Sequence, residues 1–159
     1  MERSWILVGM MGAGKSAVGR ALAEVSGRAF VDTDILLQNR FGRPIPQIFK
    51  SYGEEAFRGH ETSILKGLEP ELSVISTGGG IVQRDANWSE IRRLGTSIYL
   101  CASLETLRSR LALSKKKRPL LEVEDWEGRL TELLTAREGF YRKADITFEV
   151  DGSNVQELA

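Results

Sequence analysis

Short apolar runs alternate with longer segments of helical spacing along this chain. The apolar runs have the length of buried strands and lie at residues 5–8, 29–31, 74–75, 96–100 and 146–150. Helical patterns occupy residues 15–26, 35–41, 45–51, 54–68, 88–94, a segment from Ser103 to Leu111, and 126–141. Strands that alternate with helices predict an α/β fold in which a central parallel sheet of about five strands is covered by helices on both faces.

Glycine and proline mark the boundaries of these segments. The first helix has an apolar face that is expected to include Val25, and Gly53 is expected to break the helical block between the second and third strands. The longest polar stretch, residues 113–125, is predicted to be a loop. No repeat or linker interrupts the pattern, so residues 1–159 are expected to form one domain with a helical region at about 33–61.

The composition narrows the classes of function. Lysine plus arginine and aspartate plus glutamate each number 22, so bulk charge gives no argument for a nucleic-acid or anionic-membrane partner. Cys101 is the only cysteine, which excludes an intramolecular disulfide, and it is interpreted as a small core residue. His60 lies among charged residues and is interpreted as non-catalytic. Neither a secretory signal nor an apolar span of about 20 residues is visible, so a cytoplasmic protein is expected.

Residues 9–16 carry the strongest motif. They match the phosphate-binding pattern G-x-x-x-x-G-K-[ST] at every fixed position, between an expected strand and an expected helix. The glycines let consecutive backbone N–H groups face one anion, and the helix N-terminus adds partial positive charge. Lys15 would reach the β- and γ-phosphates, and the Ser16 hydroxyl would ligate Mg²⁺. The guanine-reading string N-K-x-D does not occur, which favours ATP over GTP.

Two aspartates, Asp32 and Asp34, follow the second expected strand. Ligands of doubly wound sheets bind at the carboxyl ends of strands, and a buried carboxylate needs a partner there. Asp32 suits metal coordination, and Asp34 suits contact with an acceptor hydroxyl. For these aspartates the alternative is a helix N-cap and a first-turn acid, which are common roles for aspartate.

Two arginines are candidates for binding an acid. Arg58 stands four residues after Glu54 and three before Glu61, so a surface ion-pair ladder is the alternative there. Arg137 falls on an apolar helical stripe, where a cation is costly unless an anion meets it. A snorkelling or ion-paired arginine is the alternative. If both arginines converge, they form a fork that matches a carboxylate.

Two loops complete the candidate site. Residues 77–80, Thr-Gly-Gly-Gly, follow the third strand and allow the backbone to approach a ligand, unless they form only a flexible turn. Residues 115–118 are Lys-Lys-Lys-Arg, within the long loop. Arg118 is the candidate for the positive charge of a lid that closes over ATP. A solvated loop or a nucleic-acid-binding tract is the alternative.

Taken in order, these motifs resemble those of the shikimate kinases over nearly the whole chain. The resemblance rests on G-x-x-G-x-G-K-S, D-x-D, G-E-x-x-F-R-x-x-E, T-G-G-G, R-P-L-L and R-x-x-x-Y, which begin at residues 9, 32, 53, 77, 118 and 137. It implies a three-layer P-loop kinase fold and transfer of the γ-phosphoryl group of ATP to the 3-hydroxyl of shikimate, with Mg²⁺, in aromatic amino-acid biosynthesis. It also implies a monomer that is cytoplasmic in bacteria.

The same resemblance implies roles for the matching residues. The residues expected to bind ATP are Gly12, Ala13, Gly14, Lys15, Ser16, Ala17 and Arg118. Those expected to bind shikimate are Asp34, Arg58, Gly79 and Arg137. Ser16 and Asp32 would hold Mg²⁺, whereas Lys15, Asp34 and Arg118 would be catalytic, with Arg118 on a lid at residues 113–125. Asp34 would lie nearest the reacting hydroxyl, either as a base or only as an orienting group.

The chain departs from the family pattern in two places. Ala17 stands where many relatives have threonine, and the closing helix expected from Val155 stops at Ala159, which predicts a less enclosed adenine site.

Two rival functions are open. The nearest is a kinase for another small hydroxy acid such as gluconate, and the arginine pair with T-G-G-G favours shikimate over it. A non-catalytic binding protein is the second rival, against which stand the intact residues Lys15, Ser16, Asp32 and Asp34.

Overall fold

The sheet consists of five parallel strands. The computed structural model describes residues 3–114 and 118–152. Its strands are β1 (Ser4–Val8), β2 (Ala29–Asp32), β3 (Ser73–Ser76), β4 (Gly95–Cys101) and β5 (Ile146–Glu149). They pair in the order β2-β3-β1-β4-β5, and every neighbouring pair is parallel. The predicted α/β class is confirmed, and each expected strand is present with its ends shifted by no more than one residue.

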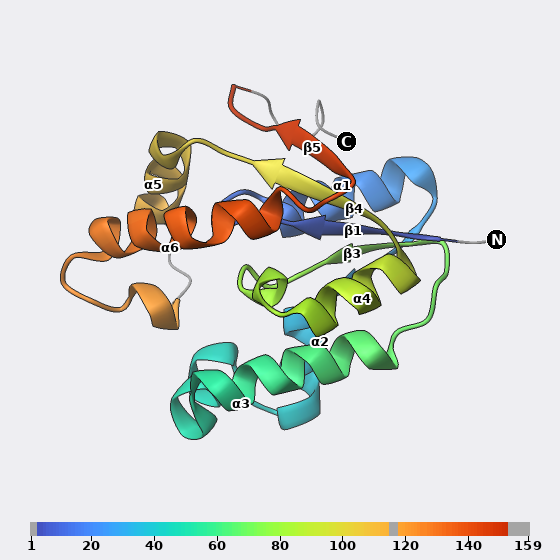
Figure 1. The fold of residues 1–159 in the computed structure, drawn as a ribbon, viewed down its shortest axis with the longest axis horizontal. Helices are drawn as coiled ribbons and strands as arrows, with labels where there is room; N and C mark the ends of the chain where they lie inside the picture. The colour runs from blue at the N-terminus through green and yellow to red at the C-terminus, as the bar shows by residue number, and fades with distance from the viewer. Residues whose placement is uncertain (1–2, 115–117, 153–159) are drawn as a thin grey trace.

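Helices cover the sheet from two sides. They are α1 (Lys15–Ser26), α2 (Thr33–Phe41), α3 (Ile45–Gly67), α4 (Asp85–Leu94), α5 (Leu104–Leu113) and α6 (Trp126–Tyr141), with short 3-10 helices at Ile81–Gln83 and Pro119–Leu121. The chain crosses the sheet one way from β1 to β2 and the other way from β3 to β4, so right-handed connections place α1 and α4 on opposite faces. Figure 1 shows the resulting three layers, with α4 and α6 together on the face opposite α1. None of the helices within the described residues is long and apolar enough to cross a membrane.

The main core surrounds the central strands. Every residue of β3 is buried, as is all of β1 except Trp5, which is the near-continuous burial expected of parallel strands with both faces covered. Val25 was expected on the buried face of α1 and is exposed, because the buried residues of this helix end at Ala23.

The edge of the sheet at β5 is thinly covered. All four residues of β5 are exposed, including Ile146 and Phe148, so the expectation of cover on both faces fails at this edge among the described residues. Cys101 lies beside this edge at the end of β4. It was expected in the core and is only half-buried, with its Sγ 3.8 Å from Nη2 of Arg142.

α2 and α3 form a helical block with an apolar cluster of its own. Leu37, Ile48, Phe57 and Ile64 are the buried members of that cluster. Inside α3, Gly53 has φ 85° and ψ 168°, which only glycine adopts readily. The predicted break is therefore present, and α3 consists of two helices that meet at a kink. His60 packs edge-on against Phe41 in this block, with ring centroids 4.6 Å apart. Figure 1 shows α3 at the edge of the molecule, with α4 between it and the sheet, while α2 begins directly after β2.

The carboxyl ends of three strands meet at one edge of the sheet. Leu7 in β1 and Asp32 in β2 are both in register with Ser76 in β3. Because the strands are parallel, the segments that follow them leave the sheet side by side. The phosphate-loop motif, the aspartate pair and the glycine triplet therefore lie next to one another.

Candidate active site

Glycines shape the loop between β1 and α1. Gly12 and Gly14 have φ of 87° and 97°, in the left-handed region that favours glycine. Gly9 lies against β4, where an added Cβ would come 2.8 Å from the carbonyl oxygen of Leu100. Gly14 is also the N-cap of α1, and it gives the first-turn amides no side-chain cap. Those amides are left to face an anion.

A cavity of about 340 Å³ opens beside this loop. Lys15 is buried in its wall, and its Nζ donates to the carbonyl oxygens of Gly9 at 2.6 Å and Met10 at 3.1 Å. Ala13 does not line the cavity, because its side chain is buried and its amide donates to Met10. The other residues predicted to bind nucleotide or metal all line it: Gly12, Gly14, Lys15, Ser16, Ala17, Asp32 and Arg118.

Oxygen ligands for a hard cation meet on this wall. Ser16 Oγ donates to Asp32 Oδ2 at 3.0 Å, while Asp32 Oδ1 caps α2 by accepting from the amides of Asp34 and Ile35. One carboxylate oxygen thus fixes the side chain, and the other faces the phosphate-loop hydroxyl. A hydroxyl and a carboxylate fit Mg²⁺, which takes few protein ligands and completes its shell with water and phosphate oxygens. Among the described residues, no three His, Cys, Asp or Glu side chains gather into a cage made of protein alone.

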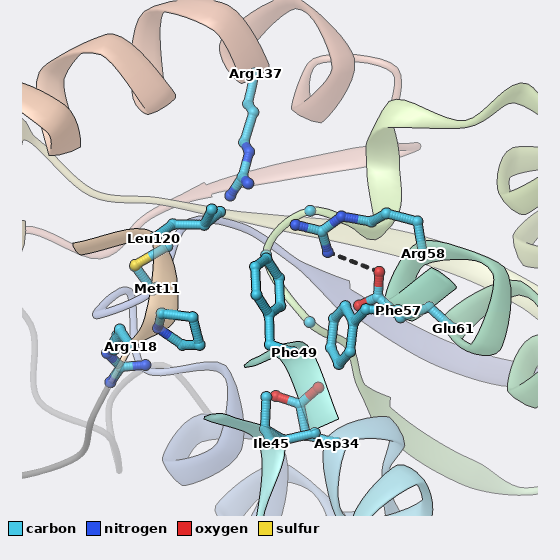
Figure 2. A pocket seen from close by; sticks show the side chains of 14 residues that line it. Met11, Asp34, Ile45, Phe49, Phe57, Arg58, Glu61, Arg118, Leu120 and Arg137 are labelled. Carbon is cyan, nitrogen blue, oxygen red and sulfur yellow. Dashed lines mark hydrogen bonds and ion pairs between the residues drawn. The ribbon is translucent and has the colours of Figure 1, made fainter. Parts of the chain in front are cut away.

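A smaller cavity of about 100 Å³ adjoins the first. The residues on the walls of both cavities are Met11, Asp34, Gly78, Gly79 and Arg118. Figure 2 shows Arg58 and Arg137 pointing toward the centre of the smaller cavity from different sides, with Asp34 across from them. The apolar part of its wall consists of Met11, Ile45, Phe49, Phe57, Pro119 and Leu120. Two cations beside an apolar wall suit a small carboxylic acid with a hydrocarbon skeleton.

A buried ion pair holds Arg58 at the wall of the smaller cavity. Its Nη1 lies 2.7 Å from Glu61 Oε1, and its Nη2 lies 3.3 Å from Glu54 Oε2. Burial opposes the charge of Arg58, but Glu61 and Glu54 outweigh it and leave its pKa above the ordinary value. Burial raises the pKa of Glu61, and Arg58 opposes that rise. The predicted ion pairs with Glu54 and Glu61 are present, but Arg58 and Glu61 are buried and not at the surface, and the guanidinium is held against the cavity.

Arg137 is the most deeply buried cation of the site. Only 1% of its surface is exposed, on the stripe that buries Leu130, Leu133 and Tyr141. Among the described residues, its Nε and Nη1 have no hydrogen-bond partner. A guanidinium with unsatisfied donors at a cavity wall is costly without an anion. The snorkelling alternative is therefore wrong, because the side chain is buried at the wall of the smaller cavity and does not reach the surface.

The glycine triplet lies against both arginines. A Cβ on Gly79 would lie 3.4 Å from Arg137 Nη1, and a Cβ on Gly80 would lie 2.5 Å from the guanidinium of Arg58. The two guanidiniums thus border neighbouring residues of one loop, and they converge as the predicted fork requires. A Cβ on Gly78 would lie 2.6 Å from Glu61 Oε2, so the loop lies against charged side chains along its length.

Asp34 and Arg118 lie at the boundary between the cavities. Asp32 is the N-cap of α2 and Asp34 is an acid of its first turn, so both aspartates occupy the positions that the alternative named. Arg118 is half-buried, and burial lowers its pKa from the ordinary value while Asp34 opposes that shift. An arginine remains charged at neutral pH even so. An acid and a cation therefore line the boundary that the two cavities share.

Sequence reasoning missed several residues of this site. Arg110 in α5 lines the larger cavity, and its Nη1 donates to the carbonyl oxygens of Gly12 and Ala13 at 3.3 and 2.8 Å. It belongs to no motif, so nothing in the sequence marked it. Glu61 and Gly80 lie inside motifs and line the smaller cavity, and the motifs themselves were the signal that could have identified them.

Comparisons with known proteins point to one family. A family model described as shikimate kinase matches residues 11–159. The shikimate kinase of Caldanaerobacter subterraneus subsp. tengcongensis is 40% identical over 155 residues, which cover 97% of this chain and 90% of that protein. The solved structure of shikimate kinase from Acinetobacter baumannii in complex with shikimate has a TM-score of 0.93 at 38% identity, over 99% of this chain and 89% of that one.

A more distant structure shares only the fold. The gluconokinase of Sinorhizobium meliloti has a TM-score of 0.63 at 18% identity, over 98% of this chain and 86% of that one. At this identity the likeness extends to the three-layer architecture and carries no argument about substrate.

Proposed function

The chain belongs to the shikimate kinase family, which transfers the γ-phosphoryl group of ATP to the 3-hydroxyl of shikimate in aromatic amino-acid biosynthesis, and from this premise we propose how its residues divide the work. The larger cavity takes ATP, and the smaller one takes shikimate. The bond from the γ-phosphorus to the bridging oxygen breaks, a bond to the 3-hydroxyl oxygen forms, and the hydroxyl proton leaves. This exchange occurs at the boundary that Asp34, Gly79 and Arg118 share.

On the donor side, backbone amides of the phosphate loop and Lys15 bind the β- and γ-phosphates. The first-turn amides of α1 and the Nζ of Lys15 supply positive charge where negative charge develops on the transferred group. Ser16 and Asp32 hold Mg²⁺, and their 3.0 Å hydrogen bond supports this pairing. When bound, the ion neutralises phosphate charge. Arg118 adds a further cation from the proposed lid at 113–125, of which residues 115–117 lie outside the described part of the chain.

On the acceptor side, Arg58 and Arg137 bind the carboxylate of shikimate, and Asp34 contacts the 3-hydroxyl. The fork formed by the arginines and the unsatisfied donors of Arg137 support the first role. The position of Asp34 on both cavity walls supports the second. Asp34 orients the hydroxyl and accepts its proton directly or after transfer. The Gly79 backbone lies close enough to this point to contact shikimate as well.

The helical region at about 33–61 and the lid belong to one domain with the sheet. The separate apolar cluster of α2 and α3 supports treating this region as a substrate-binding unit. Residues of a single chain line both cavities, which supports a monomer as the active form. Together with the metabolic role, these features fit a cytoplasmic enzyme.

The single observation that carries the assignment of substrate is the pair of buried guanidiniums that border Gly79 and Gly80. The test is an ADP-release assay with ATP, Mg²⁺ and a panel of small hydroxy acids that includes shikimate, quinate and gluconate. Turnover is expected with shikimate above all others. Turnover with gluconate and none with shikimate would overturn the assignment, and tight binding of ATP and shikimate without ADP release would identify a non-catalytic binding protein.

Substituting Gly80 by alanine is expected to raise the KM for shikimate. Gly80 has helical dihedral angles that alanine adopts, so the effect comes from the Cβ, which would lie 2.5 Å from the Arg58 guanidinium and displace it. Losing one charged hydrogen bond to the carboxylate corresponds to about a 10- to 150-fold increase in KM. The KM for ATP should change little, because Gly80 does not line the larger cavity.

Gly59→Ala is the matched control for this variant. Gly59 follows Arg58 in α3, and an added Cβ there would meet no heavy atom within 4 Å. Alanine in an exposed helix interior stabilises by about 0.8–1 kcal/mol. The control should therefore keep both KM values and gain thermal stability. Equal KM values for shikimate in Gly80→Ala and the wild type would contradict the placement of Arg58.

A further inference from the structure

A buried hydroxyl holds the glycine triplet from the side of α6. Tyr141 is fully buried, and its hydroxyl donates to the carbonyl oxygen of Gly79 at 2.6 Å. Burial raises the pKa of Tyr141 to about 12, so the hydroxyl keeps its proton at neutral pH and remains a donor. Tyr141 lies one turn after Arg137 on the same face of α6. One helix thus supplies both the cation beside Gly79 and the group that fixes the Gly79 carbonyl.

The peptide between Gly79 and Gly80 needs such a partner. Neither residue has a Cβ, so the backbone alone does little to prevent this peptide from rotating. In a trans peptide the carbonyl of one residue and the N–H of the next point in opposite directions. A bond that fixes the Gly79 carbonyl toward Tyr141 therefore also fixes the Gly80 N–H on the other side. Rotation would exchange a donor for an acceptor beside Arg137, whose Nε and Nη1 have no partner among the described residues.

A second tyrosine holds Tyr141 in place without touching the loop. The rings of Tyr99 and Tyr141 stack with centroids 5.0 Å apart and an interplanar angle of 20°. The Tyr99 hydroxyl donates to Glu138 of α6 at 2.6 Å. The two buried phenols thus share a stack and differ in where their hydroxyls bind. Loss of either hydroxyl would disturb the packing of the stack, but only loss of the Tyr141 hydroxyl would free the Gly79 carbonyl.

We propose that Tyr141 is a positioning residue for shikimate, which acts by fixing the Gly79 carbonyl and with it the backbone beside Arg137. This inference rests on the proposed function, because it takes the smaller cavity as the shikimate site. It assigns to Tyr141 no contact with shikimate or ATP. Its effect on the reaction passes through the glycine triplet and through Arg137, with which the hydroxyl also interacts, so shikimate should be affected and ATP should not.

Tyr141→Phe and Tyr99→Phe test this inference as a matched pair. Each removes one hydroxyl and keeps a ring in the stack. Shikimate affinity is measured by titration calorimetry, and KM for shikimate and for ATP by ADP release. Tyr141→Phe is expected to weaken shikimate about 2- to 13-fold, the range for one neutral hydrogen bond, and to leave the KM for ATP unchanged. Tyr99→Phe is expected to leave both unchanged, with a similar loss of thermal stability.

The possible outcomes distinguish failure of this inference from failure of the proposed function. Wild-type affinity for shikimate in Tyr141→Phe would overturn the inference while the proposed function stands. An equal loss in Tyr99→Phe, or an equal loss for ATP, would also overturn it, because the effect would then come from packing. Failure of the wild type to bind shikimate would overturn the proposed function, and the inference with it.

Discussion

Replacing Lys15 by methionine is expected to reduce kcat by at least about 10²- to 10³-fold, the cost of removing one preorganised donor from a site of developing charge. Lys15 is buried at the cavity wall and held by the carbonyl oxygens of Gly9 and Met10, so its ammonium is already positioned before nucleotide arrives. Methionine fills a similar volume without the charge. The measurement is single-turnover ADP formation at saturating ATP and shikimate.

The control for Lys15→Met is Lys66→Met, which removes an exposed lysine from the last turn of α3, away from both cavities. It should keep wild-type kcat. Shikimate binding without nucleotide should be unchanged in Lys15→Met, because Lys15 does not line the smaller cavity. A kcat within tenfold of wild type in that variant would contradict the role of the ammonium in phosphoryl transfer.

Replacing Arg137 by methionine is expected to have effects of opposite sign on binding and on stability. Truncating one charge of a buried ion pair costs about 2–5 kcal/mol, or roughly 30- to 4,000-fold in shikimate affinity. Without ligand, however, the guanidinium is 1% exposed, and its Nε and Nη1 lack partners among the described residues. An apolar side chain of similar volume should then raise the free energy of unfolding by about 1 kcal/mol or more. For this chain length that corresponds to a rise in Tm of roughly 2–4 °C.

The combination is diagnostic because a structural arginine would give the opposite sign of stability change. Calorimetry without ligand measures Tm, and titration with shikimate measures affinity. Arg129→Met is the control, since Arg129 is a partly exposed residue of the same helix, paired with the exposed Glu132. It should alter neither affinity nor Tm appreciably, as is usual for surface ion pairs. A fall in Tm in Arg137→Met together with lost affinity would mean that Arg137 mainly supports the fold.

The donor side of the site could be predicted because its information is local. Residues 9–16 are contiguous, and the strand before them and the helix after them can be predicted from neighbouring residues alone. The acceptor side was harder, because Asp34, Arg58, Gly79 and Arg137 come from four segments. Their convergence depends on the strand order and on where α3 and α6 lie relative to the sheet, which no local pattern encodes. For these residues the ordered motifs and the resemblance supplied what periodicity could not.

The missed role of Arg110 and the wrong prediction for Cys101 also arise from contacts between segments that are distant in the sequence. The role of Arg110 was not predicted because its partners are backbone carbonyl oxygens of the phosphate loop. Every residue has such an oxygen, so the sequence does not show which of them an arginine will bind. Cys101 was misplaced because an apolar strand was taken as buried to its end, whereas the edge strand β5 leaves the end of β4 half-covered.

The central place of β1 in the sheet has a consequence for how the chain folds. This strand is made first, yet its two neighbours are β3 and β4, from residues 73–76 and 95–101. At about 5–20 residues per second, several seconds of synthesis separate the first strand from its partners. During that time an apolar segment with unpaired edges awaits both neighbours, a state prone to aggregation. We therefore expect the nascent chain to depend on chaperones until β4 has left the ribosome, and the phosphate loop to become competent for nucleotide only afterwards.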